Sequence, residues 1–279
     1  RRVMKDSDSR VAYDGPLAVA VSHMSASASE IVAAALQDHG RAIIVGGKAT
    51  HGKGTVQQIL PLNRSFISRL TEDSGQLKFT ISKFYRINGT TTQRDGVTPD
   101  VILPSLLDYI GTSEGDLPRA LESDKIAEAQ YDSLDQVSSF FTSLRGASAK
   151  RISSNQDYKY ILEDIKRAKE RKEAPSISLN EKERREESAQ NKARIENRNK
   201  ERAERGLPSE KYYEVDLKIA ENDKPLKKLE PPKPKKESTD PKPNPVEDLN
   251  TFNLDPELRE ILNILSDFII LNENLASNK

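Results

Sequence analysis

The sequence contains no cysteine and no tryptophan, and it has only three histidines in 279 residues. Without cysteine the chain can form neither a disulfide nor a thiolate metal site, so an exported and a cytosolic location fit it equally well. With only His23, His39 and His51 available, a multi-histidine metal centre is not expected.

Long hydrophobic runs are also absent. The most apolar stretch, ILNILSDFII, is short and is interrupted by Asp267, whereas a transmembrane helix needs about 18 or more apolar residues. The opening residues RRVMKD do not have the pattern of a signal peptide. We expect the chain to be part of a longer protein.

Net charge is absent as well, because 44 lysines and arginines balance 44 aspartates and glutamates. No global field therefore favours nucleic acid or a membrane surface, and no nucleic-acid partner is expected.

Composition divides the chain into four segments. Hydrophobic residues make up only 35% of the chain, which is little for one compact core, and they concentrate in the first 110 positions. We predict a folded part over 1–110, a charged helical part over 111–223, a linker rich in proline and lysine over 224–248, and an amphipathic helix over 249–279.

The first segment has an α/β pattern. GPLAVAVSH (15–23) and RAIIVGG (41–47) are short apolar runs typical of buried strands. The alanine-rich stretch between them predicts a helix that ends at Gly40. This strand, helix, strand order indicates a parallel layer.

After Thr55 the pattern becomes extended. TVQQILPL, QLKFTISKFYRI and the Asn88-Gly89 turn predict strands and a hairpin, and GVTPDVILP (96–104) predicts a last extended segment. The later segments 158–173, 181–206 and 254–272 have helical patterns. For 181–206, which carries charge of both signs, we expect a solvated helix with i, i+4 pairs rather than a nucleic-acid-binding helix.

The stretch GGKATHGKGTVQQ (46–58) raises two alternatives for Lys53. It is close to a P-loop, in which a lysine and a following Ser or Thr bind phosphate where a helix begins. Here the next residue is Gly54, which cannot ligand magnesium, and two β-branched residues follow it, which favours a strand. An extended 53–60 would instead place Lys53, Thr55 and Gln57 on one face.

A lysine can also act as a general base. It must then lose its proton near neutral pH, which burial of the amine promotes. Taken alone, a lysine in such a stretch is more often a surface lysine in a turn.

The stretch MSASASE (24–30) favours the catalytic interpretation. Small residues where a strand meets a helix let a substrate approach closely, and the next backbone N–H can donate to an oxyanion. Helix capping alone explains one serine, whereas this stretch contains three.

SASASEIVAAALQD, GRAIIVGG, THGKGTVQQ, KFYRINGTTTQRDGVTPDVILP and SISLNEKERREE together resemble the carboxyl-terminal processing, or tail-specific, serine proteases, most of all the large bacterial periplasmic form with a helical extension. The resemblance implies a partial α/β core of the crotonase-like (ClpP/crotonase) type, followed by a mainly α-helical C-terminal extension. It implies Ser27 as nucleophile, Lys53 as base, Gln57 as the residue that orients the lysine, and the Ala28 N–H in the oxyanion hole. Asp38 is implicated by the resemblance too, but eleven helical residues rise about 16 Å, so we expect Asp38 to support the fold rather than to touch Ser27.

The sequence departs from the family pattern around the lysine. GGKAT is one residue longer than the usual turn, and His51 stands where an aromatic residue is common. We expect the extra residue to bulge the turn and leave Lys53 on its strand. A triad of Ser27, His51 and Asp38 is a further alternative, although the sequence shows no carboxylate placed to orient His51.

The family's upstream Asn-Gly-Gly segment and PDZ domain have no counterpart in the sequence. The resemblance thus implies a serine endopeptidase that acts from the C-terminal tail of polypeptides, without metal or organic cofactor, and that can be inactive as this fragment. It implies a periplasmic or cell-envelope location, with membrane association only through a missing N-terminal part or an adaptor. The alternatives are a catalytically incomplete scaffold that binds a partner through its helices, and a nucleotide-binding protein that uses Gly52 and Lys53.

Overall fold

The computed structural model describes residue 8 and residues 10–62, 75–173, 176–205, 212–214, 227–229 and 255–277. The chain divides into two compact units, Arg1–Glu173 with Pro256–Lys279 and Ala174–Asp255. Among the described helices, none is long and apolar enough to cross a membrane.

The centre of the first unit is a three-stranded sheet in the order β1-β2-β5. β1 (Ala18–Val21) leads through α1 (Ala28–Asp38) into β2 (Ile43–Gly46), and β1 and β2 pair in parallel, with Ala18 opposite Ile43. β5 (Val101–Ile102) pairs in parallel with the other edge of β2. The predicted parallel α/β layer is therefore confirmed. α1 begins after the carboxyl end of β1 and ends before the amino end of β2.

Both faces of the sheet are covered, because the side chains of β2 alternate between two apolar clusters. Ile44 packs with Ala33 and Ala34 of α1. Ile43 and Val45 point into the opposite cluster. A parallel sheet needs such cover on both sides, and it explains why RAIIVGG reads as a continuous apolar run.

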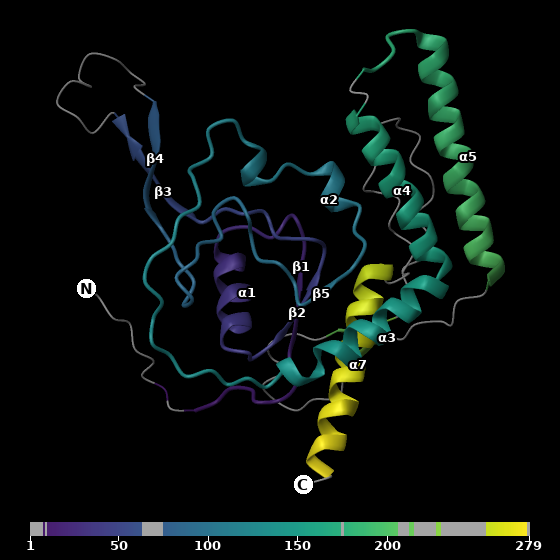
Figure 1. The fold of residues 1–279 in the computed structure, drawn as a ribbon. Helices are drawn as coiled ribbons and strands as arrows, with labels where there is room; N and C mark the ends of the chain where they lie inside the picture. Colours follow the sequence, from purple (N-terminus) through teal and green to yellow (C-terminus); the bar gives the residue numbers. More distant parts are fainter. Residues whose placement is uncertain are drawn as a thin grey trace. The chain divides into compact units, whose positions relative to one another are not determined.

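The second cover comes from helices that are distant in sequence. α3 (Phe141–Ser154) follows the short 3-10 helix η4 (Ser138–Phe140), and α7 (Pro256–Ser277) is the last helix; both lie against the sheet (Figure 1). Leu144, Ile264 and Phe268 pack with the strand residues in one cluster. The amphipathic helix predicted near the C-terminus thus docks its apolar face on the α/β core.

An ion-pair cluster joins α3 to α7. The Arg151 guanidinium contacts the carboxylates of Glu260 at 2.8 Å and Asp267 at 2.7 Å. Glu260 is only 3% exposed, so its charge would be costly to bury without this partner.

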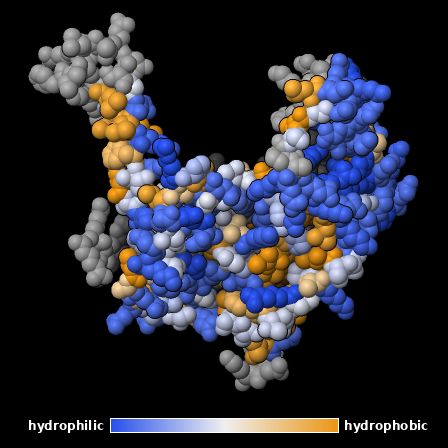
Figure 2. All heavy atoms as spheres, turned by 45° about the horizontal axis from the view of Figure 1, so that its top comes forward, coloured by the Kyte–Doolittle hydropathy of each residue, from blue (hydrophilic) through white to orange (hydrophobic). Residues whose placement is uncertain are grey.

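The predicted hairpin is formed by β3 (Thr55–Pro61) and β4 (Gln76–Lys83), which pair antiparallel. A bulge at Val56/Gln57 shifts the register, so Ile81 has no partner in the ladder. Asn88 and Gly89 form a separate turn after β4, in which Arg86 N donates to the Thr90 carbonyl. Figure 2 shows hydrophobic surface on this hairpin. The large apolar side chains exposed there, among the described residues, are Val56, Ile59, Leu60, Leu77, Phe79 and Ile81.

The remaining elements are mostly helical. In the first unit these are α2 (Leu107–Ile110), the 3-10 helix η3 (Glu114–Asp116) and α4 (Gln156–Glu173). In the second unit α5 (Glu181–Arg205) has no buried residue and carries i, i+4 pairs such as Arg185 with Glu181, as expected for a solvated helix.

The second unit also contains β6 (Tyr212–Glu214) and β7 (Lys227–Leu229), which pair antiparallel. Apart from β7, the linker predicted over 224–248 lies outside the described residues. The four-segment division of the chain stays a prediction.

Candidate active site

Ser27 occupies the turn between β1 and α1, directly before the first helical residue. Its backbone has φ 58° and ψ −112°, which is unusual for any residue other than glycine. Conformations of this kind cost about 1–3 kcal/mol and persist only where the surroundings impose them. Ser27 is half-buried, so its hydroxyl lies at a sharp, strained turn at the amino end of a helix.

We expect Ser27→Gly to unfold at higher denaturant than Ser27→Ala. Glycine adopts a positive φ without strain but loses about 0.5–1 kcal/mol of chain entropy, so the net advantage should be about 1 kcal/mol. Equilibrium urea unfolding of the two variants measures this difference. An alanine variant as stable as the glycine variant would show that the turn is unstrained.

The carboxylate of Glu30 binds the backbone of this turn. Glu30 is the third residue of α1 and is fully buried, and its Oε2 accepts the backbone N–H of Ser27 at 2.7 Å. The same oxygen accepts the backbone N–H of Lys53 at 2.9 Å. Its other oxygen accepts the Gly52 N–H at 2.7 Å and the Thr50 hydroxyl at 2.5 Å.

One carboxylate thus joins the turn at Ser27 to the loop of residues 47–54 between β2 and β3, which we call the lysine loop. Because the Ser27 and Lys53 nitrogens contact the same oxygen, they lie no more than about two hydrogen-bond lengths apart. A further bond, from His51 N–H to the Ser25 carbonyl at 2.9 Å, joins the same two segments. The structure therefore brings together the backbones of the two residues expected to form a dyad.

The chain after Lys53 continues as strand β3 from Thr55, not as a helix. A P-loop needs a helix at this point, because the phosphate is bound by the helix amino end. The nucleotide-binding alternative at Gly52 and Lys53 is therefore wrong for this loop. Lys53 itself is half-buried and lies two residues before β3, slightly outside the extended segment that was predicted.

The start of the lysine loop is fixed by Asp108 of α2. Its carboxylate accepts the Lys48 N–H at 3.0 Å, and burial raises the pKa of Asp108 while this bond opposes the rise. Gly52, with φ +92°, closes the turn; a Cβ there would come within 2.6 Å of the Arg94 carbonyl oxygen. Only glycine fits at this position.

Gln57 and Thr55 lie on one face of β3, as the period of two predicts. Both line the same open cavity, although Thr55 is buried whereas Gln57 is exposed. The role of Gln57 in orienting Lys53 stays a prediction.

Asp38 lies at the far end of α1 from Ser27 and is bound elsewhere. Its carboxylate forms two bonds with the Arg86 guanidinium, from Nε at 3.0 Å and from Nη2 at 2.5 Å, and only 7% of its side chain is exposed. The pair clamps α1 to the segment after β4. This placement agrees with a supporting role for Asp38.

The triad of Ser27, His51 and Asp38 has no geometric support, because Asp38 is paired with Arg86. A different carboxylate does approach His51: the Nε2 atom lies 3.8 Å from Oε2 of Glu114 in η3. This contact could not be predicted, because His51 and Glu114 are far apart in the chain.

Ala28 is the first residue of α1 and is exposed. Among the described residues its N–H has no hydrogen-bond acceptor, whereas the neighbouring Ser27 N–H is bound to Glu30. The Ala28 N–H is therefore free to donate to an oxyanion at the start of the helix.

Two residues of this site, Glu30 and Thr50, were not predicted from the sequence. Ser27 and Glu30 have the S-x-x-E spacing of a capping box, which could have singled out the glutamate locally. Nothing in the sequence shows that its carboxylate also reaches Thr50, Gly52 and Lys53. Among the described residues no group of three or more His, Cys, Asp or Glu side chains is arranged to hold a metal ion.

Two family models match the chain in adjacent segments. Residues 1–103 match the model of peptidase family S41, and residues 107–270 match the model described as the C-terminal domain of tail specific protease.

Individual relatives agree with the models. The chain is 39% identical over 197 residues to the tail-specific protease of Haemophilus influenzae, which covers 69% of this chain and 28% of that protein. It is 44% identical over 88 residues to the carboxy-terminal-processing protease of Bartonella bacilliformis, covering 32% of this chain and 18% of that one. It is 37% identical over 99 residues to carboxyl-terminal-processing peptidase 2, chloroplastic, of Arabidopsis thaliana, covering 36% and 17%. The chain thus spans less than a third of the length of these relatives.

Proposed function

The chain belongs to the tail-specific proteases of peptidase family S41, as its motifs indicated, and from this we propose that the intact protein hydrolyses peptide bonds with a Ser27 and Lys53 dyad. The observation that carries the proposal is the Glu30 carboxylate, which binds the backbones of both residues. The mixed α/β core that holds them is proposed to be of the crotonase-like type.

The reaction proceeds through an acyl-enzyme. The neutral Lys53 amine takes the proton of the Ser27 hydroxyl as its oxygen bonds to the substrate carbonyl carbon. The carbon–nitrogen bond then breaks, and the leaving amine receives that proton from Lys53. Water then gives a proton to the same amine as its oxygen bonds to the acyl carbon. The bond from this carbon to the Ser27 oxygen breaks, that oxygen takes the proton back from Lys53, and the new carboxyl end is released.

Other residues support these steps. The Ala28 N–H stabilises the oxyanion together with the positive end of the α1 dipole. Gln57 orients the Lys53 amine, and Asp38 fixes α1 through Arg86. No metal or organic cofactor is required by this chemistry.

The substrates are proposed to be polypeptides with accessible C-termini, because the relatives are named for tail-specific or C-terminal processing activity. We propose a periplasmic or cell-envelope location. The competing possibility, a scaffold without catalysis, predicts that no covalent intermediate forms.

The proposal is tested by trapping the acyl-enzyme. The intact protein is mixed with an activated peptide ester, quenched with acid, digested and analysed by mass spectrometry. We expect the acyl group on the peptide that contains Ser27, and no acylation in Ser27→Ala. The matched variant Ser29→Ala, which removes the next serine of the same stretch, should still be acylated. Turnover without a Ser27 adduct would contradict the proposed mechanism.

A further inference from the structure

An open cavity of about 470 Å³ lies beside the beginning of β3. Thr55, Gln57 and Thr80 of the hairpin form one side of it, and residues 114 and 117–121 form the other. We call it the β3 cavity. Its volume is in the range of sites that bind small groups, and Thr55 is only two residues from Lys53.

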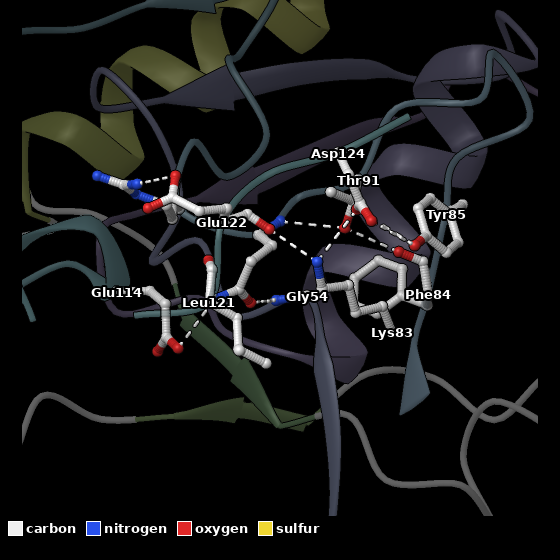
Figure 3. Close-up of polar contacts among 11 residues, drawn as sticks. Gly54, Lys83, Phe84, Tyr85, Thr91, Glu114, Leu121, Glu122 and Asp124 are labelled. Atoms are coloured by element: carbon white, nitrogen blue, oxygen red, sulfur yellow. Dashed lines mark hydrogen bonds and ion pairs between the residues drawn. The ribbon is translucent and has the colours of Figure 1, made fainter. Parts of the chain in front are cut away.

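The far wall of the β3 cavity is fixed to the lysine loop by Gln93. This side chain is fully buried, and its Oε1 accepts the Gly54 N–H at 3.0 Å. Its Nε2 donates to Oε1 of Glu114 and to the Leu121 carbonyl, both at 3.1 Å. Figure 3 shows Gly54, Glu114 and Leu121 around this network. Gln93 therefore fixes the position of Gly54, the residue after Lys53, relative to Glu114 and Leu121 of the cavity wall.

Two more contacts keep the wall in place. The Lys83 ammonium donates to the Glu122 carbonyl at 2.7 Å, and the Glu114 N–H donates to the His51 carbonyl at 2.9 Å. His51 in turn donates to Ser25, two residues before the nucleophile. Hydrogen bonds thus connect the wall of the β3 cavity to the segments that carry Ser27 and Lys53, and the cavity is preformed.

The lining indicates which group the cavity accepts. Leu117 and Leu121 are 45% and 46% exposed, so apolar surface faces the open space without cover. Glu114 carries a negative charge, and Arg119 a positive one with no ion-pair partner among the described residues. Charges of both signs disfavour a charged occupant, whereas two leucines favour an aliphatic or aromatic one.

We propose that the β3 cavity is a subsite that binds an apolar side chain of the polypeptide substrate near the scissile bond. This rests on the proposed protease function. Gln93 acts as a positioning residue, because it sets the distance between the Leu121 wall and the strand that carries Thr55 and Gln57. The segment 114–121 falls within the match to the tail-specific C-terminal domain model, so that region would contribute to substrate choice.

The test is a change in substrate preference. Thr80→Trp, which fills the β3 cavity, is compared with Ile81→Trp, the next residue of β4, which does not line it. The intact protein cleaves a series of fluorogenic peptides in which one residue at a time, on either side of the cleaved bond, is Ala, Leu, Phe, Asp or Lys. At one position, Thr80→Trp should lower the ratio of kcat/KM for Leu over Ala at least about tenfold, while Ile81→Trp leaves it unchanged.

A second variant guards against misfolding of the first. Leu121→Ala enlarges the cavity and should shift the preference from Leu to Phe at the same position, whereas Leu162→Ala on α4, 49% exposed, should not. Unchanged ratios in both cavity variants, with wild-type cleavage intact, would overturn the subsite alone. Peptide cleavage that is absent in the wild type, or undiminished in Ser27→Ala, would overturn the protease function and the subsite together.

Discussion

Lys53→Met is expected to lower peptide hydrolysis by the intact protein about 10³- to 10⁴-fold. Methionine keeps the length of the side chain but cannot accept a proton, and removal of a general base costs about this much. The backbone N–H of residue 53 still binds Glu30, so the loop should keep its shape. kcat/KM on a peptide substrate measures the effect, with circular dichroism and thermal unfolding to verify the fold.

Lys48→Met is the matched control, because Lys48 belongs to the same loop. Its ammonium lies 4.6 Å from the centre of the Tyr109 ring, and the interaction with Tyr109 raises the pKa of Lys48, which makes this amine a poorer proton acceptor. We expect Lys48→Met to change hydrolysis less than about threefold. Equal losses in the two variants would mean that Lys53 acts only through loop structure or charge.

Glu30→Gln is expected to reduce both stability and turnover. The carboxylate accepts four hydrogen bonds from Ser27, Thr50, Gly52 and Lys53. A glutamine amide presents one NH₂ group to donors, which leaves about two buried donors unsatisfied, at roughly 1–3 kcal/mol each. We expect the free energy of unfolding to fall by about 2–4 kcal/mol and kcat to fall about 10²-fold, since small displacements of catalytic groups cost about that much.

Glu260→Gln separates the two effects. Glu260 is another nearly buried glutamate, 3% exposed, but it serves the Arg151 cluster between α3 and α7. Its substitution should also lower the free energy of unfolding, by about 1–3 kcal/mol, but should leave kcat unchanged. Urea unfolding and kcat measured on both variants decide the matter. If Glu30→Gln lost stability without losing kcat, the shared carboxylate would be a structural contact only.

Local patterns in the sequence were enough to predict the elements that carry the site. The apolar runs around Ala18 and Ile43, with the alanine-rich stretch between them, gave the parallel strand, helix, strand unit, because β2 is buried on both faces. The β-branched residues after Gly54 correctly excluded a helix there. These predictions depend on neighbours within a few residues, which a sequence shows directly.

Contacts between distant segments could not be predicted in the same way. Glu30 reaches Gly52 and Lys53, Arg86 reaches Asp38, and Gln93 reaches Leu121, each across at least 22 residues. The docking of α7 on the sheet spans still more of the chain. A carboxylate or amide that binds backbone groups leaves no pattern at its partners, because any residue supplies the N–H or C=O that it contacts.

The double variant Ser27→Ala with Lys53→Met tests most directly whether the two residues act as one catalytic unit. Residues that work in one step lose their effect together, so a second substitution adds little to the first. We predict that the kcat/KM of the double variant equals that of the weaker single variant within about threefold. If the two losses multiplied, with each single variant retaining activity that the other substitution removes, Ser27 and Lys53 would act independently and the dyad would be contradicted.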